Sequence, residues 1–147
     1  MNVQAVARDQ ATEEFFDGTA AGVYLIRRCL PHGHASKPQA TQCAVCASPD
    51  LRWDPSSGRA QLASWAVVPG RRTGSGGLDE PAVAAESGGA EPEATIVAIG
   101  ELEEGPWMWA RLVGADPSHL SEGMALRIAF ERPPGSEAIP VLTPAAP

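Results

Sequence analysis

Long apolar segments are missing from this sequence of 147 residues. No apolar run approaches the length of a membrane span, and residues 1–16 do not contain the continuous apolar core of a signal peptide. Cysteine is also scarce, because the chain has only three. That number favours metal ligation in a reducing compartment over a disulfide framework. We therefore expect a cytoplasmic protein that does not enter membranes.

Basic residues are few as well, with 11 against 18 acidic ones and a net charge of −7. A balance of this sign argues against non-specific binding to nucleic acid. Residues 73–94 contain five acidic residues, no basic residue and no aromatic residue, so we predict a flexible acidic insertion at about residues 70–94. Residues 21–72 instead carry seven basic residues against two acidic ones. This basic part suits a phosphorylated ligand or an acidic partner, or its charges are ordinary solvated side chains.

The three cysteines and two of the three histidines lie between residues 29 and 46. They form two short knuckles, Cys29-x-x-His32 and Cys43-x-x-Cys46, about a dozen residues apart. Zinc prefers thiolate and imidazole donors in a tetrahedron, and two such pairs supply four of them. We predict a structural Zn²⁺ held by Cys29, His32, Cys43 and Cys46, because four protein donors leave no open position for a substrate.

Other interpretations of these residues stay open at this point. Cys43 and Cys46 alone also have the spacing of a redox dithiol. A further alternative is that they are two small buried apolar residues. If neither histidine binds, a three-ligand catalytic site remains. His34 competes with His32 as the imidazole donor, and only the x-x spacing favours His32.

Apolar patterning predicts one short helix and a series of strands. Residues 9–17 have acidic residues early and carry Phe15 and Phe16, which is typical of a helix that ends before Gly18. A β-rich run at residues 22–29 leads into the first knuckle. Further strands are predicted at residues 51–53, 59–68, 95–102, 107–113, 124–131 and 139–142.

Details of the later strands indicate how they assemble. Strict alternation in the first long strand puts Leu62 and Ser64 on one face. Asp116 as a cap and Pro117 in the first position start a helical turn, and Pro140 makes the last strand a candidate edge. Five strands with a helical turn before the fourth are the outline of an OB-type Greek-key barrel.

We therefore expect a mainly β protein built from three parts. A short N-terminal helix occupies residues 1–20, a rubredoxin-like zinc ribbon occupies residues 21–50, and a five-stranded OB-fold barrel occupies residues 51–147. The acidic insertion belongs to the barrel.

This order of parts resembles a known family, the zinc-ribbon/OB-fold proteins associated with acyl-CoA enzymes, long catalogued as a domain of unknown function. The resemblance runs from about Phe15 to Leu142. It is carried by the order and spacing of short motifs: Phe15-Phe16-Asp17-Gly18 with Gly22, the two knuckles with Gly33, Ser48-Pro49-Asp50-Leu51 before Trp53, Ser57-Gly58-Arg59, Ile96-Val97-Ala98, Leu102-Glu103-Glu104-Gly105, Leu112-Val113-Gly114, Asp116-Pro117, Leu120 and Gly123-Met124.

The sequence departs from the family pattern in the ribbon. His32 stands where the family usually has cysteine, and Ala47 stands where a glycine usually follows the second knuckle. The aromatic and proline residues common between the knuckles are reduced to Lys37-Pro38. Histidine still provides a competent zinc donor, whereas the altered loop weakens any ligand contact inferred from it.

The resemblance implies a non-catalytic accessory subunit that stabilises a thiolase-superfamily enzyme in a hetero-oligomer and frames its acyl-CoA channel. The partner class includes thiolases, steroid side-chain aldolases and acyltransferases, so the setting is lipid or steroid metabolism. The chain agrees with a non-catalytic role, because its cysteines are assigned to the metal and none is left as a catalytic nucleophile. His119, Glu101, Glu103 and Glu104 are interpreted as solvated surface groups rather than catalytic ones.

Four aromatic residues are candidates for the partner interface: Phe15, Phe16, Trp107 and Trp109. Aromatic side chains that a small core does not need often anchor a partner. Plain core packing is the alternative for each of them.

Arg27, Arg28 and Lys37 are candidates for contact with acyl-CoA. Their cationic groups are suited to charge-assisted hydrogen bonds with the CoA phosphates. The sequence alone does not decide whether the chain contacts CoA.

The rival function is a module that binds single-stranded nucleic acid, because ribbons and OB barrels both do so. Such a module needs aromatic stacking platforms within a basic groove. Residues 95–147 hold three basic residues against seven acidic ones, which disfavours that function.

Overall fold

The computed structural model describes residues 5–70 and 93–145. It contains one α-helix, α1 (Glu13–Ala20), a short 3₁₀ turn η1 (Pro117–His119) and eight strands. The strands are β1 (Leu25–Cys29), β2 (Ala35–Ser36), β3 (Leu51–Pro55), β4 (Arg59–Val68), β5 (Thr95–Leu102), β6 (Trp107–Leu112), β7 (Ala125–Glu131) and β8 (Ile139–Pro144). The predicted acidic insertion lies outside the described residues except at its two ends. In the described part, no helix combines the length and apolarity needed to cross a membrane.

Helix α1 begins and ends later than the sequence predicts. Asp9 and Thr12 hydrogen-bond each other through their backbone amides and side chains at 2.9 Å, so they form a separate turn before the helix. Gly18 lies inside the helix, and a Cβ at this position would approach the Leu25 side chain to 2.8 Å. A glycine thus permits close packing of α1 against β1 here instead of ending the helix.

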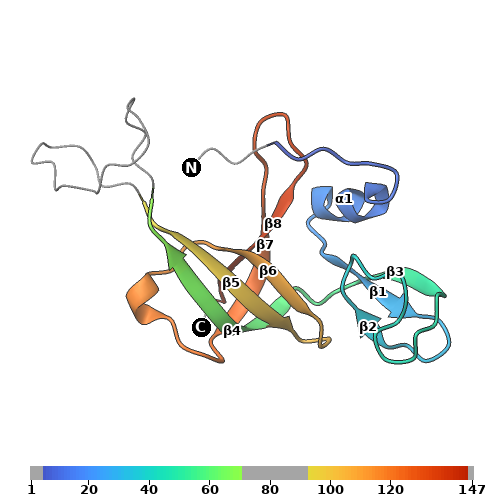
Figure 1. Ribbon diagram of the computed structural model, residues 1–147. Coiled ribbons are helices and arrows are strands. Elements are labelled where there is room, and N and C mark those ends of the chain that lie inside the picture. The colour runs from blue at the N-terminus through green and yellow to red at the C-terminus, as the bar shows by residue number, and fades with distance from the viewer. Residues whose placement is uncertain (1–4, 71–92, 146–147) are drawn as a thin grey trace, which may run out of the picture.

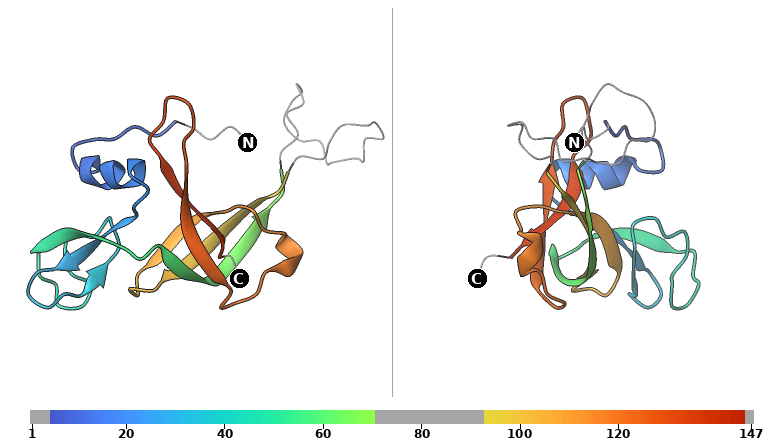
Figure 2. Two further views of the ribbon diagram at one scale, coloured as in Figure 1. Left: turned by 180° about the vertical axis from the view of Figure 1, so that it is seen from behind. Right: turned by 60° about the vertical axis from the view of Figure 1, so that its left-hand side comes forward.

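The ribbon is a three-stranded antiparallel sheet in the order β2-β1-β3. β3 pairs with β1 along its whole length, from Leu25 opposite Pro55 to Cys29 opposite Leu51. The strand predicted after residue 50 as part of the barrel instead completes the ribbon sheet. Figure 1 shows the ribbon beside the barrel, with α1 above it, and Figure 2 gives the same arrangement from behind.

The second sheet closes into a barrel with the order β4-β5-β6-β8-β7, which confirms the predicted five-stranded OB fold. All its strand pairs are antiparallel except β6 with β8, which are parallel and pair at Leu112 and Leu142. β8 pairs with β6 only at Leu142, so its first residues have β7 alone as a neighbouring strand, as Pro140 suggested. Pro140 is accommodated because it lies opposite Phe130 of β7, on a part of β8 that β6 does not reach.

Strict alternation along β4 is wrong, because the register with β5 shifts between Leu62 and Ser64. Leu62 is buried, whereas Ser64 is exposed, and Trp65 then lies opposite Ala98, which has no exposed surface. A bulge of this kind moves later side chains to the other face and helps a strand to curve around a barrel.

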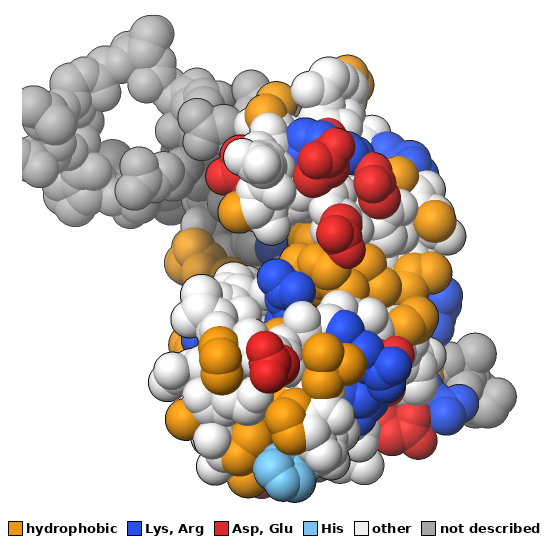
Figure 3. Space-filling view, turned by 90° about the vertical axis from the view of Figure 1, so that its right-hand side faces the viewer, with side chains coloured by type: hydrophobic (Ala, Val, Ile, Leu, Met, Phe, Trp, Pro, Cys, Tyr) orange, Lys and Arg blue, Asp and Glu red, His pale blue; other side chains and the backbone are white. Residues whose placement is uncertain are grey.

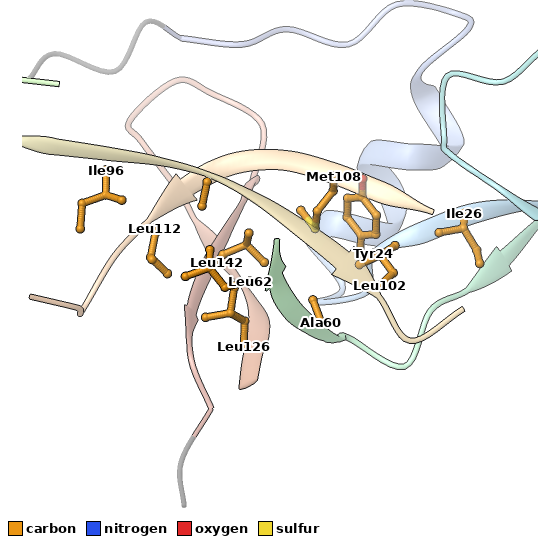
Figure 4. Close-up of a cluster of buried hydrophobic side chains, with 11 residues drawn as sticks. Tyr24, Ile26, Ala60, Leu62, Ile96, Leu102, Met108, Leu112, Leu126 and Leu142 are labelled. Atoms are coloured by element: carbon orange, nitrogen blue, oxygen red, sulfur yellow. The ribbon is translucent and has the colours of Figure 1, made fainter. Parts of the chain in front are cut away.

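One continuous core joins the ribbon to the barrel. Figure 4 shows Tyr24 lying beside Met108 and Leu102 of the barrel, with Ile26 on the ribbon side of the same cluster. Burial raises the pKa of the Tyr24 hydroxyl to about 12. The two parts therefore share packed apolar contacts instead of being joined by the linker alone.

The segment before α1 is attached to the loop between β7 and β8. The Arg8 guanidinium donates to both carboxylate oxygens of Glu137, at 2.7 and 3.0 Å, and also donates to Asp17 at 2.6 Å. Val6 adds a backbone hydrogen bond, because its carbonyl accepts from the Glu137 amide at 2.9 Å. Bidentate pairs of this kind fix orientation as well as charge.

Arg8→Ala is expected to raise the pKa of Glu137. The hydrogen bond from Arg8 is the main cause that holds this pKa below its ordinary value. A depressed carboxylate pKa stabilises the fold above the unfolded pKa, and that contribution is lost as pH falls through the folded pKa. Carbon-13 NMR of the Glu137 carboxyl should give a titration midpoint below about 4.3 in the parent chain and a return to it in the variant.

Glu103 serves as an internal control in the same titration. Its pKa is also lowered, but by Ser57 and Arg59, so Arg8→Ala should leave it unchanged. An unshifted Glu137 midpoint in the variant would show that Arg8 does not hold this carboxylate in solution.

Candidate metal centre

The two predicted knuckles form turns whose backbone amides point at sulfur. The His32 amide donates to Cys29 Sγ and the Val45 amide donates to Cys43 Sγ, each at 3.4 Å. Cys29 and Cys43 are buried, whereas Cys46 is exposed. Amide hydrogen bonds stabilise thiolates, which is the form that binds metal.

Four donor side chains meet at this end of the ribbon. The ligand atoms of Cys29, His32, His34 and Cys46 all lie within 4.8 Å of one another. Cys43 approaches the same place, because its Sγ is 3.6 Å from His34 Nδ1. The structure thus gathers all four predicted ligands and adds His34. Soft sulfur and imidazole donors without carboxylates suit zinc.

Hydrogen bonds lower the pKa of two of the three thiols. For Cys43 the amide of Cys46 is the main cause, and the pKa falls to about 7. For Cys29 burial acts in the opposite direction, but hydrogen bonds from the amides of His34 and His32 outweigh it and lower the pKa. These thiols are therefore predisposed to the charge state of a metal ligand.

Ala47 has a backbone conformation that normally favours glycine. Its φ of 57° lies in the left-handed region, and its amide donates to the Cys43 carbonyl at 3.0 Å to close the second knuckle. Holding a non-glycine residue there costs about 1–2 kcal/mol. The second knuckle thus holds an alanine in a conformation that glycine adopts without strain.

The three predicted CoA-binding residues point to different places. Arg28 donates to Asp54 at 2.7 Å and to the Gly33 carbonyl at 2.8 Å, so it supports the first knuckle. The Arg27 guanidinium stacks 3.6 Å above the Trp53 ring. Lys37 is exposed and lines a separate hollow next to the barrel. Their contact with CoA phosphates stays a prediction.

Acidic and basic side chains are unevenly distributed between the helix and the ribbon. Figure 3 shows acidic side chains, with basic ones beside them, over the part that contains α1, basic side chains with some acidic ones over the ribbon, and an apolar strip between the two parts. The acidic residues of α1 are Glu13, Glu14 and Asp17. The structure therefore places the predicted basic excess on the ribbon side of this face.

The four predicted interface aromatics separate into two pairs. Phe16 is buried, and Phe15 packs edge to face against Phe16 and Tyr24 with ring centroids 5.3 and 5.6 Å away. This pair attaches α1 to the ribbon, as the packing alternative predicted. Trp107 and Trp109 instead are 56% and 74% exposed on the outer face of β6.

The barrel strands β4 to β7 match the model of a known protein family. The family model described as the ChsH2 C-terminal OB-fold domain matches residues 53–131, more than half of the chain. The chain belongs to this family. The match runs from β3 to the end of β7. The residues of the metal cluster precede the matched segment.

Two solved structures share the fold of this ChsH2-family chain. A chain of the Ltp2-ChsH2(DUF35) aldolase has a TM-score of 0.70 at 23% identity, with 95% of this chain and 98% of that one covered. A DUF35-family protein of unknown function from Sulfolobus solfataricus has a TM-score of 0.55 at 15% identity, with 81% and 77% covered. No curated protein matches the chain.

Proposed function

We propose that this protein is a non-catalytic accessory subunit of a thiolase-like acyl-CoA enzyme, bound through the outer face of β6. The main observation behind this proposal is the exposure of Trp107 and Trp109. Exposed large aromatic side chains are unfavourable in water, and they are typical anchors of protein interfaces. The solved chain that shares its fold along almost the whole length belongs to the Ltp2-ChsH2(DUF35) aldolase, which supports a partner of the thiolase-like class.

The surroundings of the two tryptophans suit a protein partner. They border a hollow of about 940 Å³ between the ribbon and the barrel, lined also by Ala35, Lys37 and Gln42. On the neighbouring strand β5, Ile99 pairs with Trp109 and Glu101 pairs with Trp107. This surface combines aromatic anchors with a polar margin, which is the composition of a specific interface.

The charges on this face disfavour nucleic acid as the partner. Arg111 follows Trp109 on the same face, but it is ion-paired with Glu131, and Glu101 is exposed beside Trp107. A single strand needs aromatic platforms within a basic groove. Lys37 lines the hollow beside the two tryptophans, but one lysine near an exposed glutamate does not make a basic groove.

The chemical groups of the chain support an accessory role. In residues 5–70 and 93–145 the cysteines lie at the metal cluster and His119 is exposed on a short turn. Glu103 is ion-paired with Arg59 at 3.0 Å, and Glu104 accepts a hydrogen bond from the Ser57 amide. We assign the reactive groups of the complex to the partner and a structural task to the metal.

Trp109→Ala is expected to weaken binding to a thiolase-like partner by about 30-fold, since interface anchors contribute about 2 kcal/mol or more. The side chain is largely exposed, so the fold should not change. The measurement is the Kd between the full chain and a candidate thiolase-like protein, followed by co-elution on a sizing column.

Val67→Ala is the matched control, because Val67 is also exposed on the barrel but lies near the far end of β4 from Trp107. It should leave the Kd unchanged. Separate elution of the parent chain and the thiolase-like protein, together with salt-dependent binding of single-stranded DNA, would replace this proposal with the nucleic-acid function.

A further inference from the structure

Five donor side chains surround the metal cluster, whereas tetrahedral zinc takes four. Bonds of about 2.3 Å to sulfur and about 2.0 Å to nitrogen place neighbouring donors about 3.8 Å apart for two sulfurs and about 3.6 Å apart for sulfur and nitrogen. Cys29 Sγ lies 3.8 Å from Cys46 Sγ, and His34 Nδ1 lies 3.6 Å from Cys43 Sγ and 3.9 Å from Cys29 Sγ. Three edges of one tetrahedron therefore already have the right length.

Cys43 belongs to the same tetrahedron. Its side chain is buried, and its Sγ lies 3.6 Å from His34 Nδ1. A buried thiol with such neighbours is better explained as a ligand than as a packing residue. With three sulfurs fixed, only one position is left for an imidazole.

His32 does not fill that position as well as His34 does. Its ring is exposed and stacks on the His34 ring with centroids 5.5 Å apart and planes 22° apart. Its backbone amide donates to Cys29 Sγ at 3.4 Å, and a nitrogen of its ring lies within 4.8 Å of the donor atoms of Cys29, His34 and Cys46.

We propose that Cys29, His34, Cys43 and Cys46 hold the metal, that His34 binds through Nδ1, and that His32 contributes only its amide hydrogen bond and its stacked ring. The first knuckle is then Cys29-x₄-His34, and the choice of His32 from spacing alone is replaced. This assignment does not rest on the accessory function, since it concerns the chain without its partner.

Paired substitutions in the full chain test the assignment. His34→Ala should lower zinc affinity by about 100-fold or more, which exceeds the effect of losing an outer-shell group. His32→Ala, its matched control, should change the affinity by less than about 10-fold. Competition with a chromophoric zinc chelator gives both values. A larger loss for His32→Ala than for His34→Ala would overturn the proposal.

Metal substitution tests it without any variant, in case His34→Ala does not fold. Cobalt(II) bound to the parent chain should give the charge-transfer intensity of three thiolates. Cadmium-113 should couple in NMR to the Hε1 proton of the His34 ring but not to its Hδ2 proton, as binding through Nδ1 requires. Coupling to the His32 ring, or a spectrum of only two thiolates, would contradict the assignment whether or not the chain binds a thiolase-like partner.

Discussion

Cys29→Ser is expected to unfold the ribbon while the barrel stays folded. Cys29 has only 1% of its surface exposed, and it contacts both Cys46 and His34, so it is a ligand in every assignment considered above. Structural zinc contributes about 10–16 kcal/mol in zinc-finger peptides. A three-stranded sheet with a two-residue strand β2 is too small to be stable without such a contribution.

Amide hydrogen exchange measures this effect locally. In the variant, protection should be lost along β1 and β3, whereas β5, β7 and β8 should keep theirs. A chelator added to the parent chain should have the same effect. Loss of protection should stop at the shared core, where Tyr24 packs against Met108.

Ala47→Gly is the control in the same knuckle. It removes the strain of a left-handed alanine and should leave ribbon protection unchanged or slightly higher. If Cys29→Ser and Ala47→Gly gave equal protection in β1 and β3, the ribbon would not depend on a metal.

Local patterns in the sequence predicted most of the barrel. Period-two alternation located β7, and β-rich composition with a turn between the two strands located β5 and β6. The cap at Asp116 was confirmed by its hydrogen bond from the Ser118 amide at 2.9 Å. These features depend on residues close together in the chain, whose chemistry is visible in the sequence. The paired knuckles were recognised for the same reason.

The features that sequence analysis missed depend on residues far apart in the chain. The pairing of β3 with β1 and the attachment of Arg8 to Glu137 join segments that no local pattern connects. The position of His34 Nδ1 depends on how the first knuckle turns at Gly33, whose φ is 74°. Spacing alone could not distinguish His34 from His32, because it carries no information on which ring faces the sulfurs.

Leu142 of β8 lies at the point where the barrel closes. It has no exposed surface, its carbonyl accepts from the Val113 amide at 2.8 Å, and it lies where β8 meets both β6 and β7. Leu142→Ala is expected to cost about 3–5 kcal/mol of unfolding free energy, because a closed barrel cannot collapse easily around the cavity. Urea unfolding followed by tryptophan fluorescence measures the loss.

Val68→Ala, at a half-exposed position on β4, is the control and should change the free energy by less than about 0.5 kcal/mol. Gly100→Ala makes the test specific to the position, because a Cβ at residue 100 would lie 3.0 Å from Leu142 Cδ1. Alone it should destabilise the barrel through overpacking. Combined with Leu142→Ala it should fill part of the cavity, with a favourable coupling of about 0.5–3 kcal/mol. Simple additivity of the two changes would place Leu142 away from β5 in solution and contradict the packing that closes the barrel.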